Sequence, residues 1–208
     1  MKLKHLKPFV FLGCLVPLAL LGAGALRGQL GANPIEKITH QTGDWTLILL
    51  LVTLVITPLR RITGINELIA FRRMLGLFAF FYGTLHFFTY IWLDKFFDTH
   101  EIVKDVYKRP FITAGFTGFV LMIPLAITST KGWIRRLGKK WLLVHRLIYA
   151  SAIAGVVHYI WLVKKDVRKP LIYAAILALL LLWRIANWLI QRQKAAAAKL
   201  PAAPSVAA

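Results

Sequence analysis

Three of the six histidines in this chain of 208 residues fall inside long apolar stretches, where an ionisable side chain usually has a function. Met74 and Trp141 begin two apolar stretches that would enter a membrane from the same side, and His86 and His158 lie 12 and 17 residues further on. A helical rise of 1.5 Å per residue puts them about 18 Å and about 26 Å deep, against about 6 Å for His145. We therefore expect His86 and His158 to meet in the outer half of the bilayer, and His145 to lie in a separate layer.

Two neutral imidazoles that face each other across a helical bundle can fill both axial positions of a haem iron. An iron ligated in this way has no open position, so it suits electron transfer better than oxygen binding. Two alternatives to a haem site stay open. The two histidines can be buried, hydrogen-bonded and purely structural, and the small residues near them can serve only to pack helices together. Zinc is less favoured, since it takes four ligands, or three and a water, and this layer offers no carboxylate or thiol. Small residues near the histidines would leave room for the flat macrocycle, and they are Gly76, Ala79, Gly83, Gly115, Gly118, Ala152, Ala154 and Gly155.

The elements that carry these histidines belong to a chain that is too apolar for a soluble enzyme. Hydrophobic residues make up 58% of it and charged residues only 17%, with a mean hydropathy of +0.64. We predict an all-α membrane protein, a six-transmembrane-helix bundle that forms one domain over residues 1–193. The predicted spans are Phe9–Leu26, Trp45–Leu59, Met74–Leu93, Phe111–Thr128, Trp141–Val163 and Leu171–Ile190.

The charged residues predict how the bundle is oriented. There are 27 Lys and Arg against 8 Asp and Glu, a formal charge of +19, and the basic residues form short clusters between the apolar runs. That pattern is typical of membrane topology and argues against a nucleic-acid partner. With the N-terminus inside, 15 basic residues face the cytoplasm and 10 face outward, while seven of the eight acidic residues face outward. We therefore predict that both the N- and the C-terminus are cytoplasmic and that membrane lipid surrounds the bundle.

Both ends of the chain carry further signals. The basic start, the apolar run and Ala23-Gly24-Ala25 also fit a cleavable signal peptide, but we expect the first helix to stay uncleaved as a span. Residues 194–208 are rich in Ala and Pro, and we predict a disordered cytoplasmic tail there.

Several short motifs carry a resemblance to a known family. The chain contains Tyr82-Gly83-Thr84-Leu85-His86, Trp141-x3-His145-Arg146-Leu147-x-Tyr149 and His158-Tyr159, together with Arg72-Arg73-Met74-Leu75-Gly76 and Thr128-Ser129. Two histidines separated by twelve residues in one span, with a partner two spans earlier, resemble the ferric-reductase-like transmembrane family, which includes the NADPH oxidases. Within it the chain is most similar to the MsrQ family, and the resemblance covers roughly residues 1–193.

The resemblance implies a function in electron transfer across the bacterial cell inner membrane. MsrQ-type proteins bind haem b, with FMN as a further cofactor, and take electrons from the quinone pool or from a separate flavin reductase. The electrons pass to an MsrP-like periplasmic molybdenum-cofactor reductase, which reduces methionine sulfoxide in oxidised proteins. We therefore expect an electron-transfer subunit without catalytic residues, because the sulfoxide chemistry would belong to the partner.

Site residues follow from the same resemblance. We expect His86 and His158 as the axial ligands of the haem iron, with His145 as a possible further ligand and Arg184 as a cofactor-binding residue. NADPH oxidases have two histidines in each ligand span, but 13 and 14 residues before His86 this chain has Arg73 and Arg72. A second bis-histidine haem is therefore not expected. His145 can ligate a haem alone, contact FMN or a quinone, or hydrogen-bond within the bundle.

Two further points remain open at the level of sequence. Arg184 can bind an FMN phosphate or a haem propionate by a two-pronged hydrogen bond, or it can extend to the lipid headgroups. The whole chain can instead be a small membrane transporter or an assembly scaffold, with structural or proton-relay histidines. Transporters often show internal repeats, and we find no clear repeat in the sequence.

Overall fold

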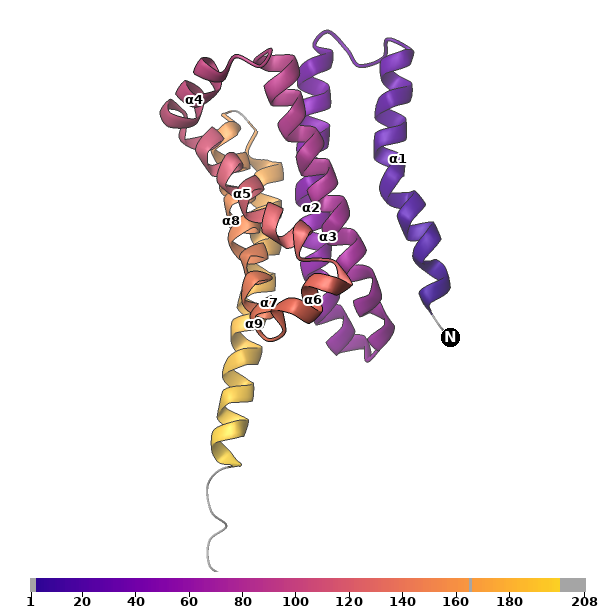
Figure 1. Cartoon of the computed structure of the whole chain (residues 1–208), viewed down its shortest axis with the longest axis vertical. Coiled ribbons are helices and arrows are strands. Elements are labelled where there is room, and N and C mark those ends of the chain that lie inside the picture. The colour runs from indigo at the N-terminus through magenta and orange to yellow at the C-terminus, as the bar shows by residue number, and fades with distance from the viewer. Residues whose placement is uncertain (1–2, 165, 199–208) are drawn as a thin grey trace, which may run out of the picture.

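Helices account for all the regular secondary structure in the part of the chain that the computed structural model describes, residues 3–164 and 166–198. Six of the helical segments are long and apolar enough to cross a membrane (Figure 1), which confirms the predicted all-α membrane fold. They are α1 (Lys7–Leu26), α2 (Pro34–Thr63), α3 (Ile69–Phe88) with the π-helical η3 (Thr89–Asp94), α5 (Pro110–Ile127), α7 (Lys140–Val144) with α8 (Leu147–Leu162), and α9 (Arg168–Ala197). Short helical turns at Leu3–Leu6 (η1) and Asn66–Leu68 (η2) precede α1 and α3.

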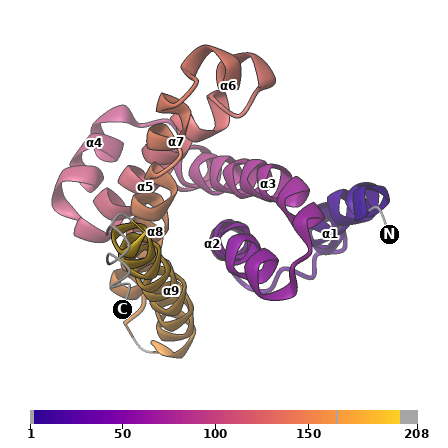
Figure 2. The same ribbon diagram turned by 90° about the horizontal axis from the view of Figure 1, so that it is seen from below.

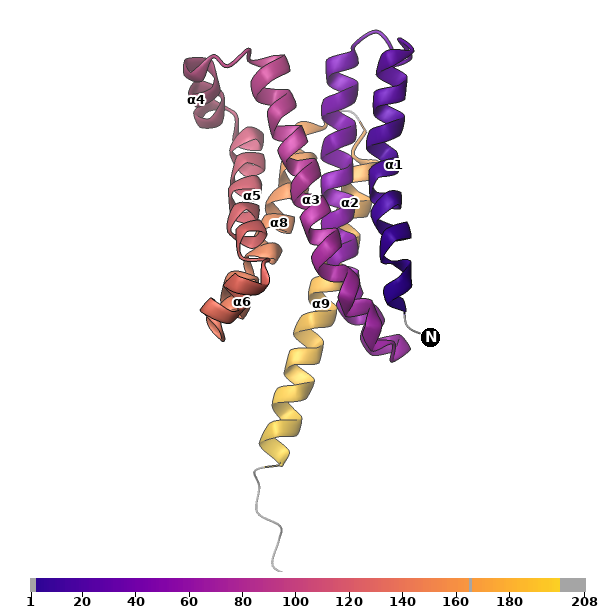
Figure 3. The same cartoon turned by 45° about the vertical axis from the view of Figure 1, so that its right-hand side comes forward.

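Two helical hairpins form the centre of the bundle. Helix α2 packs along α3, α5 packs along α8, and α3 also contacts α5, so the two hairpins meet along α3. Figure 2 shows α1 and α9 on the outside of this arrangement, and in Figure 3 α1, α2 and α3 run side by side. The buried core is contributed mainly by α2 and α3, with Leu54, Ala79 and Tyr82 almost completely enclosed.

Local signals explain why α2 is longer than predicted. Asn33 caps the first turn by accepting a hydrogen bond from the backbone N–H of Glu36 at 3.2 Å, and Pro34 occupies the first helical position, which suits proline. At the other end Gly64 takes a left-handed conformation with φ +72°, which is typical of a residue that ends a helix. The apolar run therefore marks the part of the helix inside the membrane, and the caps mark its ends.

Three further details differ from the sequence prediction. The span expected over Trp141–Val163 is interrupted at His145 and Arg146, where the N–H groups of Arg146 and Tyr149 bond to carbonyls three residues back instead of four. The third span ends in the π-helical η3. Helix α9 continues through Ala197, four residues into the segment predicted as a disordered tail, because alanine is the best helix former. Residues 199–208 of that segment lie outside the described residues.

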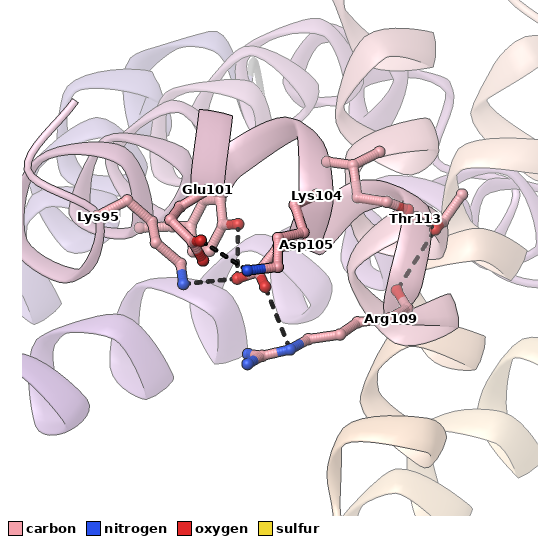
Figure 4. A network of polar contacts seen from close by, with 8 residues as sticks. Lys95, Glu101, Lys104, Asp105, Arg109 and Thr113 are labelled. Carbon is pink, nitrogen blue, oxygen red and sulfur yellow. Dashed lines mark hydrogen bonds and ion pairs between the residues drawn. The ribbon is translucent and has the colours of Figure 1, made fainter. Parts of the chain in front are cut away.

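One end of the bundle carries α4 (Thr99–Lys108), an amphipathic helix that the sequence analysis missed because it is too short and too polar for a span. Figure 4 shows how charged side chains tie it down: Lys95 and Arg109 contact the Asp105 carboxylate at 2.6 and 3.2 Å, and Thr113 donates to the Val106 carbonyl. Burial alone would raise the pKa of Asp105, but the two cations outweigh it and hold that pKa below its usual range. The opposite end carries α6 (Lys131–Leu137), and we name the two ends the α4 end and the α6 end. The start of α1 and the end of α9 both lie toward the α6 end in Figure 1.

Candidate functional site

His86 and His158 come together toward the α4 end of the bundle. His86 lies in the last turn of α3 and His158 near the end of α8, and their ring centroids are 6.1 Å apart with the ring planes at 73°. The structure thus places in one layer the two histidines that residue counting placed together. Both side chains are largely enclosed by the surrounding helices.

Each of the two rings donates one hydrogen bond to the protein backbone. The Nδ1–H of His86 donates to the Thr39 carbonyl at 2.9 Å, and that of His158 donates to the Phe111 carbonyl at 2.6 Å. Since a carbonyl only accepts, Nδ1 carries the proton in both neutral rings and Nε2 keeps its lone pair. This is the tautomer of a metal-ligating histidine whose other nitrogen is held by an outer hydrogen bond.

The spacing of the two rings fits one metal ion held between them. Two bonds of about 2 Å from a metal to imidazole nitrogen, plus about 1 Å from each nitrogen to its ring centre, give a centroid separation of about 6 Å. The observed 6.1 Å agrees with that value. The donor set of two neutral imidazoles is also the one that fills both axial positions of a haem iron.

A glycine lies beneath each of these rings. A Cβ atom built on Gly115 would come within 2.7 Å of His158 Nδ1, and one built on Gly43 would come within 3.1 Å of the His86 ring. The space is therefore already occupied by the imidazoles, and any larger residue would displace them. The sequence analysis singled out Gly115 as a small residue but missed Gly43, which lies in a polar segment before the apolar run.

The two halves of the site repeat each other with an offset of 72 residues. His86 rests on Gly43 and bonds to the carbonyl four residues before that glycine, and His158 does the same with Gly115. Each hydrogen bond spans 47 residues of the chain. The sequence showed no clear repeat because the side chains between these positions differ, although the two equal glycine-to-histidine intervals were there to be found. The α2–α3 and α5–α8 hairpins thus contribute one histidine each.

His145 lies away from this pair, toward the α6 end, in the interruption between α7 and α8. Its ring stacks on Trp141 with centroids 3.9 Å apart, and its Nε2 shares a hydrogen bond of 3.1 Å with the Thr128 hydroxyl. Trp141 itself donates from Nε1 to the Thr128 carbonyl at 3.0 Å. Of the roles left open for His145, the structure directly shows the hydrogen bond within the bundle.

Arg184 joins α9 to the rest of the bundle. Its guanidinium donates to the Leu54 carbonyl at 2.6 Å, to the Tyr149 hydroxyl at 3.2 Å and to the Leu180 carbonyl at 3.1 Å. The residue four positions after Leu54 is Pro58, which has no N–H, so this buried carbonyl has lost its partner within the helix. Arg184 therefore supplies the hydrogen bond that the proline removes, and the sequence gave no reason to connect these two residues.

Comparisons with known proteins agree with this architecture. Residues 42–156 match the protein family described as the ferric reductase like transmembrane component. The chain is 55% identical over 187 residues to the protein-methionine-sulfoxide reductase heme-binding subunit MsrQ of Herminiimonas arsenicoxydans, covering 88% of this chain and 86% of that one. It is 50% identical over 206 residues to MsrQ of Xanthomonas campestris pv. campestris strain 8004, covering 95% and 94% of the two chains. The chain belongs to the MsrQ family.

Membership of the MsrQ family rests on most of the chain, whereas the pairing of His86 with His158 rests on the geometry of the structure. The ferric-reductase match includes Gly43, His86 and Gly115 and ends two residues before His158. A further MsrQ, from Azospira oryzae, is 51% identical over 186 residues, which is 88% of this chain and 80% of that protein. No solved structure matches the chain.

Proposed function

We propose that this MsrQ-family chain carries electrons across the bacterial inner membrane through haem b, from the quinone pool or a separate flavin reductase to an MsrP-like periplasmic reductase of methionine sulfoxide. The observation that carries the proposal is the pair His86 and His158, facing each other at a ring separation of 6.1 Å with each Nδ1–H held by a backbone carbonyl. The relatives are named as haem-binding subunits, which supports the same function.

In this proposal the protein's work is to hold and orient. His86 and His158 would hold the haem iron from α3 and α8, and their hydrogen bonds to the Thr39 and Phe111 carbonyls fix the ring orientation and would make Nε2 a stronger ligand. When bound, the haem supplies one-electron chemistry. With both imidazoles serving the iron, the site would suit electron transfer and would leave no position for a substrate.

The partner and the topology follow from the same proposal. The relatives are named as subunits of a methionine-sulfoxide reductase, so the sulfoxide chemistry lies in a second protein, for which we propose a soluble molybdenum-cofactor enzyme. With both termini cytoplasmic, as the basic residues predict, the α4 end faces the periplasm and His86 and His158 lie near it. Residues 1–193 then form the haem-binding domain.

His145 is our proposed contact for a second group, which can be haem, FMN or a quinone. It lies toward the opposite end of the bundle from the ligand pair, where an electron donor on the cytoplasmic side would arrive. Arg184, the other residue expected to bind a cofactor, donates three of its five N–H groups to protein oxygens, so a direct contact with FMN would use the remaining two.

The experiment that tests the proposal is an oxidised-minus-reduced visible spectrum of the purified membrane protein, with haem and flavin quantified per chain. We expect a low-spin b-type spectrum that is lost in His86→Ala and in His158→Ala, while His145→Ala keeps much of it. Full haem retention in both of the first two variants would overturn the ligand assignment. A protein that purifies folded with neither chromophore would instead favour a transporter or an assembly scaffold.

A further inference from the structure

A groove runs between α1 and α3 at the α6 end of the bundle. Its volume is about 600 Å³, within the range of small-molecule sites. Its walls are mostly apolar, with Phe11 and Leu15 from α1 and Leu77 and Phe81 from α3. Two cations, Lys7 and Arg73, are the exceptions.

The groove has a closed end and a floor. Toward the α4 end the Tyr82 hydroxyl of α3 inserts into the backbone ladder of α1, donating to the Cys14 carbonyl at 2.8 Å and accepting from the Leu18 N–H at 3.2 Å. Phe11 and Phe78 meet edge to face at 5.0 Å and form the floor. Helix α1 is therefore fastened to α3 at the level of Tyr82, and toward the α6 end the Phe11–Phe78 pair keeps the two helices in contact beneath the groove.

The two cations lie at the same end of the groove. Lys7 is the first residue of α1 and Arg73 lies in the second turn of α3, and both helices run from the α6 end toward the α4 end. From Lys7 to Leu15, and from Arg73 to Phe81, is eight residues, or about 12 Å of helix. One leaflet of a bilayer has a hydrocarbon layer of about 15 Å, so the apolar part of the groove matches one leaflet in depth.

Neither cation has an acidic partner in the part of the chain that the structure describes. The ion pairs found there involve His40, Lys95, Lys104 and Arg109, all at the other end of the bundle or in its loops. The groove thus has two cations without an acidic partner at its α6 end and an apolar part that is about as deep as one leaflet. This combination is complementary to a molecule with an anionic head and an acyl chain.

We propose that the groove between α1 and α3 is a binding site for one acidic phospholipid, with its phosphate group at Lys7 and Arg73 and an acyl chain against Phe11, Leu15, Leu77 and Phe81. The lipid would come from the leaflet at the α6 end, which is the inner leaflet on the topology that the basic residues predict. It would fill the groove and add to the contacts that hold α1 to the bundle. The site is separate from the histidine pair and does not depend on haem binding.

The test is native mass spectrometry of the purified, delipidated full chain with added phosphatidylglycerol or phosphatidylcholine of matched acyl chains. Two cations near a headgroup predict a preference for phosphatidylglycerol on the order of 10-fold. The double variant Lys7→Gln, Arg73→Gln should lose most of that preference, whereas Lys139→Gln, Lys140→Gln, which removes the same charge from exposed positions outside the groove, should keep it. The conservative Arg73→Lys should also keep it.

A filling variant tests the apolar part of the groove. Leu77→Trp leaves both cations in place and occupies the space of the acyl chain, so we expect weaker retention of the lipid in this variant. Equal binding of the two lipids by the unaltered protein would overturn the proposal. An equal loss of preference in the two charge variants would do so too, because it would show only a general attraction to positive charge, and so would displacement of the lipid by added FMN. The helical circular dichroism and thermal unfolding of each variant confirm that it has folded, whether or not haem is bound.

Discussion

Replacing Gly115 by alanine should disturb the ligand pair without touching either histidine. The added Cβ would lie 2.7 Å from His158 Nδ1 and 3.0 Å from Cε1, about 0.7 Å inside ordinary van der Waals contact at 3.4 Å. Moving helix α5 away from α8 would break the close contact one turn further on, where the Gly118 carbonyl accepts a hydrogen bond from the Ser151 hydroxyl at 2.8 Å. The ring of His158 has to tilt, and its 2.6 Å hydrogen bond to the Phe111 carbonyl has to lengthen.

The size of the effect can be estimated from two sources. Overpacking of this kind costs about 1–3 kcal/mol in a packed interior. Loss of the outer hydrogen bond of a metal-ligating histidine typically lowers metal affinity by about 10–100-fold. We therefore expect Gly115→Ala to reduce haem per chain after purification and to weaken haem affinity by about 10-fold or more.

Two other glycines provide a graded comparison. Gly43→Ala places its Cβ 3.1 Å from the His86 ring, a smaller overlap, and should give a smaller loss of haem. Gly76→Ala meets only a methyl group of Thr53 at 3.7 Å, an ordinary contact on the same helix as His86, and should behave like the unaltered protein. Haem is measured per chain in detergent, and the low-spin bands report the axial ligands. Full haem content with an unchanged spectrum in Gly115→Ala would refute the reasoning.

Three further predictions concern the contacts that position the site. Arg184→Met should lower the free energy of unfolding by about 1.5–3 kcal/mol, because the buried Leu54 carbonyl loses a charged donor. Adding Pro58→Ala should restore much of that loss, since residue 58 then has an N–H for this carbonyl. An equal cost of Arg184→Met with and without Pro58→Ala would disprove the pairing. Tyr82→Phe should free α1, so that a maleimide reaches the buried Cys14 thiol faster, and unchanged labelling would contradict the fastening. The Asp105→Asn variant should melt at a lower temperature than the unaltered protein at pH 6, and this difference in melting temperature should shrink toward pH 3. A difference that stays constant with pH would argue against the ion pairs of Asp105. The direction follows because the pKa of Asp105 is lower in the folded chain than in the unfolded chain, where it is about 3.9. The ion pairs of Asp105 therefore stabilise the fold fully above that unfolded pKa, and this stabilisation is lost as the pH falls through the pKa of the folded chain.

Depth along a helix was the part of the site that could be predicted from sequence. Because the rise per residue is constant, counting from the start of an apolar run to His86 and to His158 gives their level in the bundle. The six apolar runs predicted six spans for a related reason, since a fixed bilayer thickness requires a fixed length of apolar helix. Both arguments use distances along one helix only.

Contacts between helices could not be predicted in the same way. That His86 bonds to the Thr39 carbonyl depends on how α2 and α3 are rotated against each other, which no residue spacing within either helix reports. The link from Arg184 to the Leu54 carbonyl has the same character, because it needs Pro58 on one helix and an arginine 130 residues away along the chain from its acceptor. Short elements such as α4 were missed because they contain no long apolar run, although Asp98 caps the first turn of this helix by accepting from the Glu101 N–H.

The internal repeat gives a physical reason why the two ends of the bundle differ in chemistry. The offset of 72 residues that relates His86 to His158 relates Arg73 to His145, so the α6 end has an imidazole on one hairpin and a guanidinium on the other. A guanidinium stays protonated and has no lone pair to offer a metal, so it cannot serve as the second axial ligand. Arg73 lines the groove beside α1 instead, and His145 bonds to Thr128. Of the six histidines, all within the described residues, only His86 and His158 face each other, so a group bound at His145 would have one imidazole from this chain where the α4 end offers two.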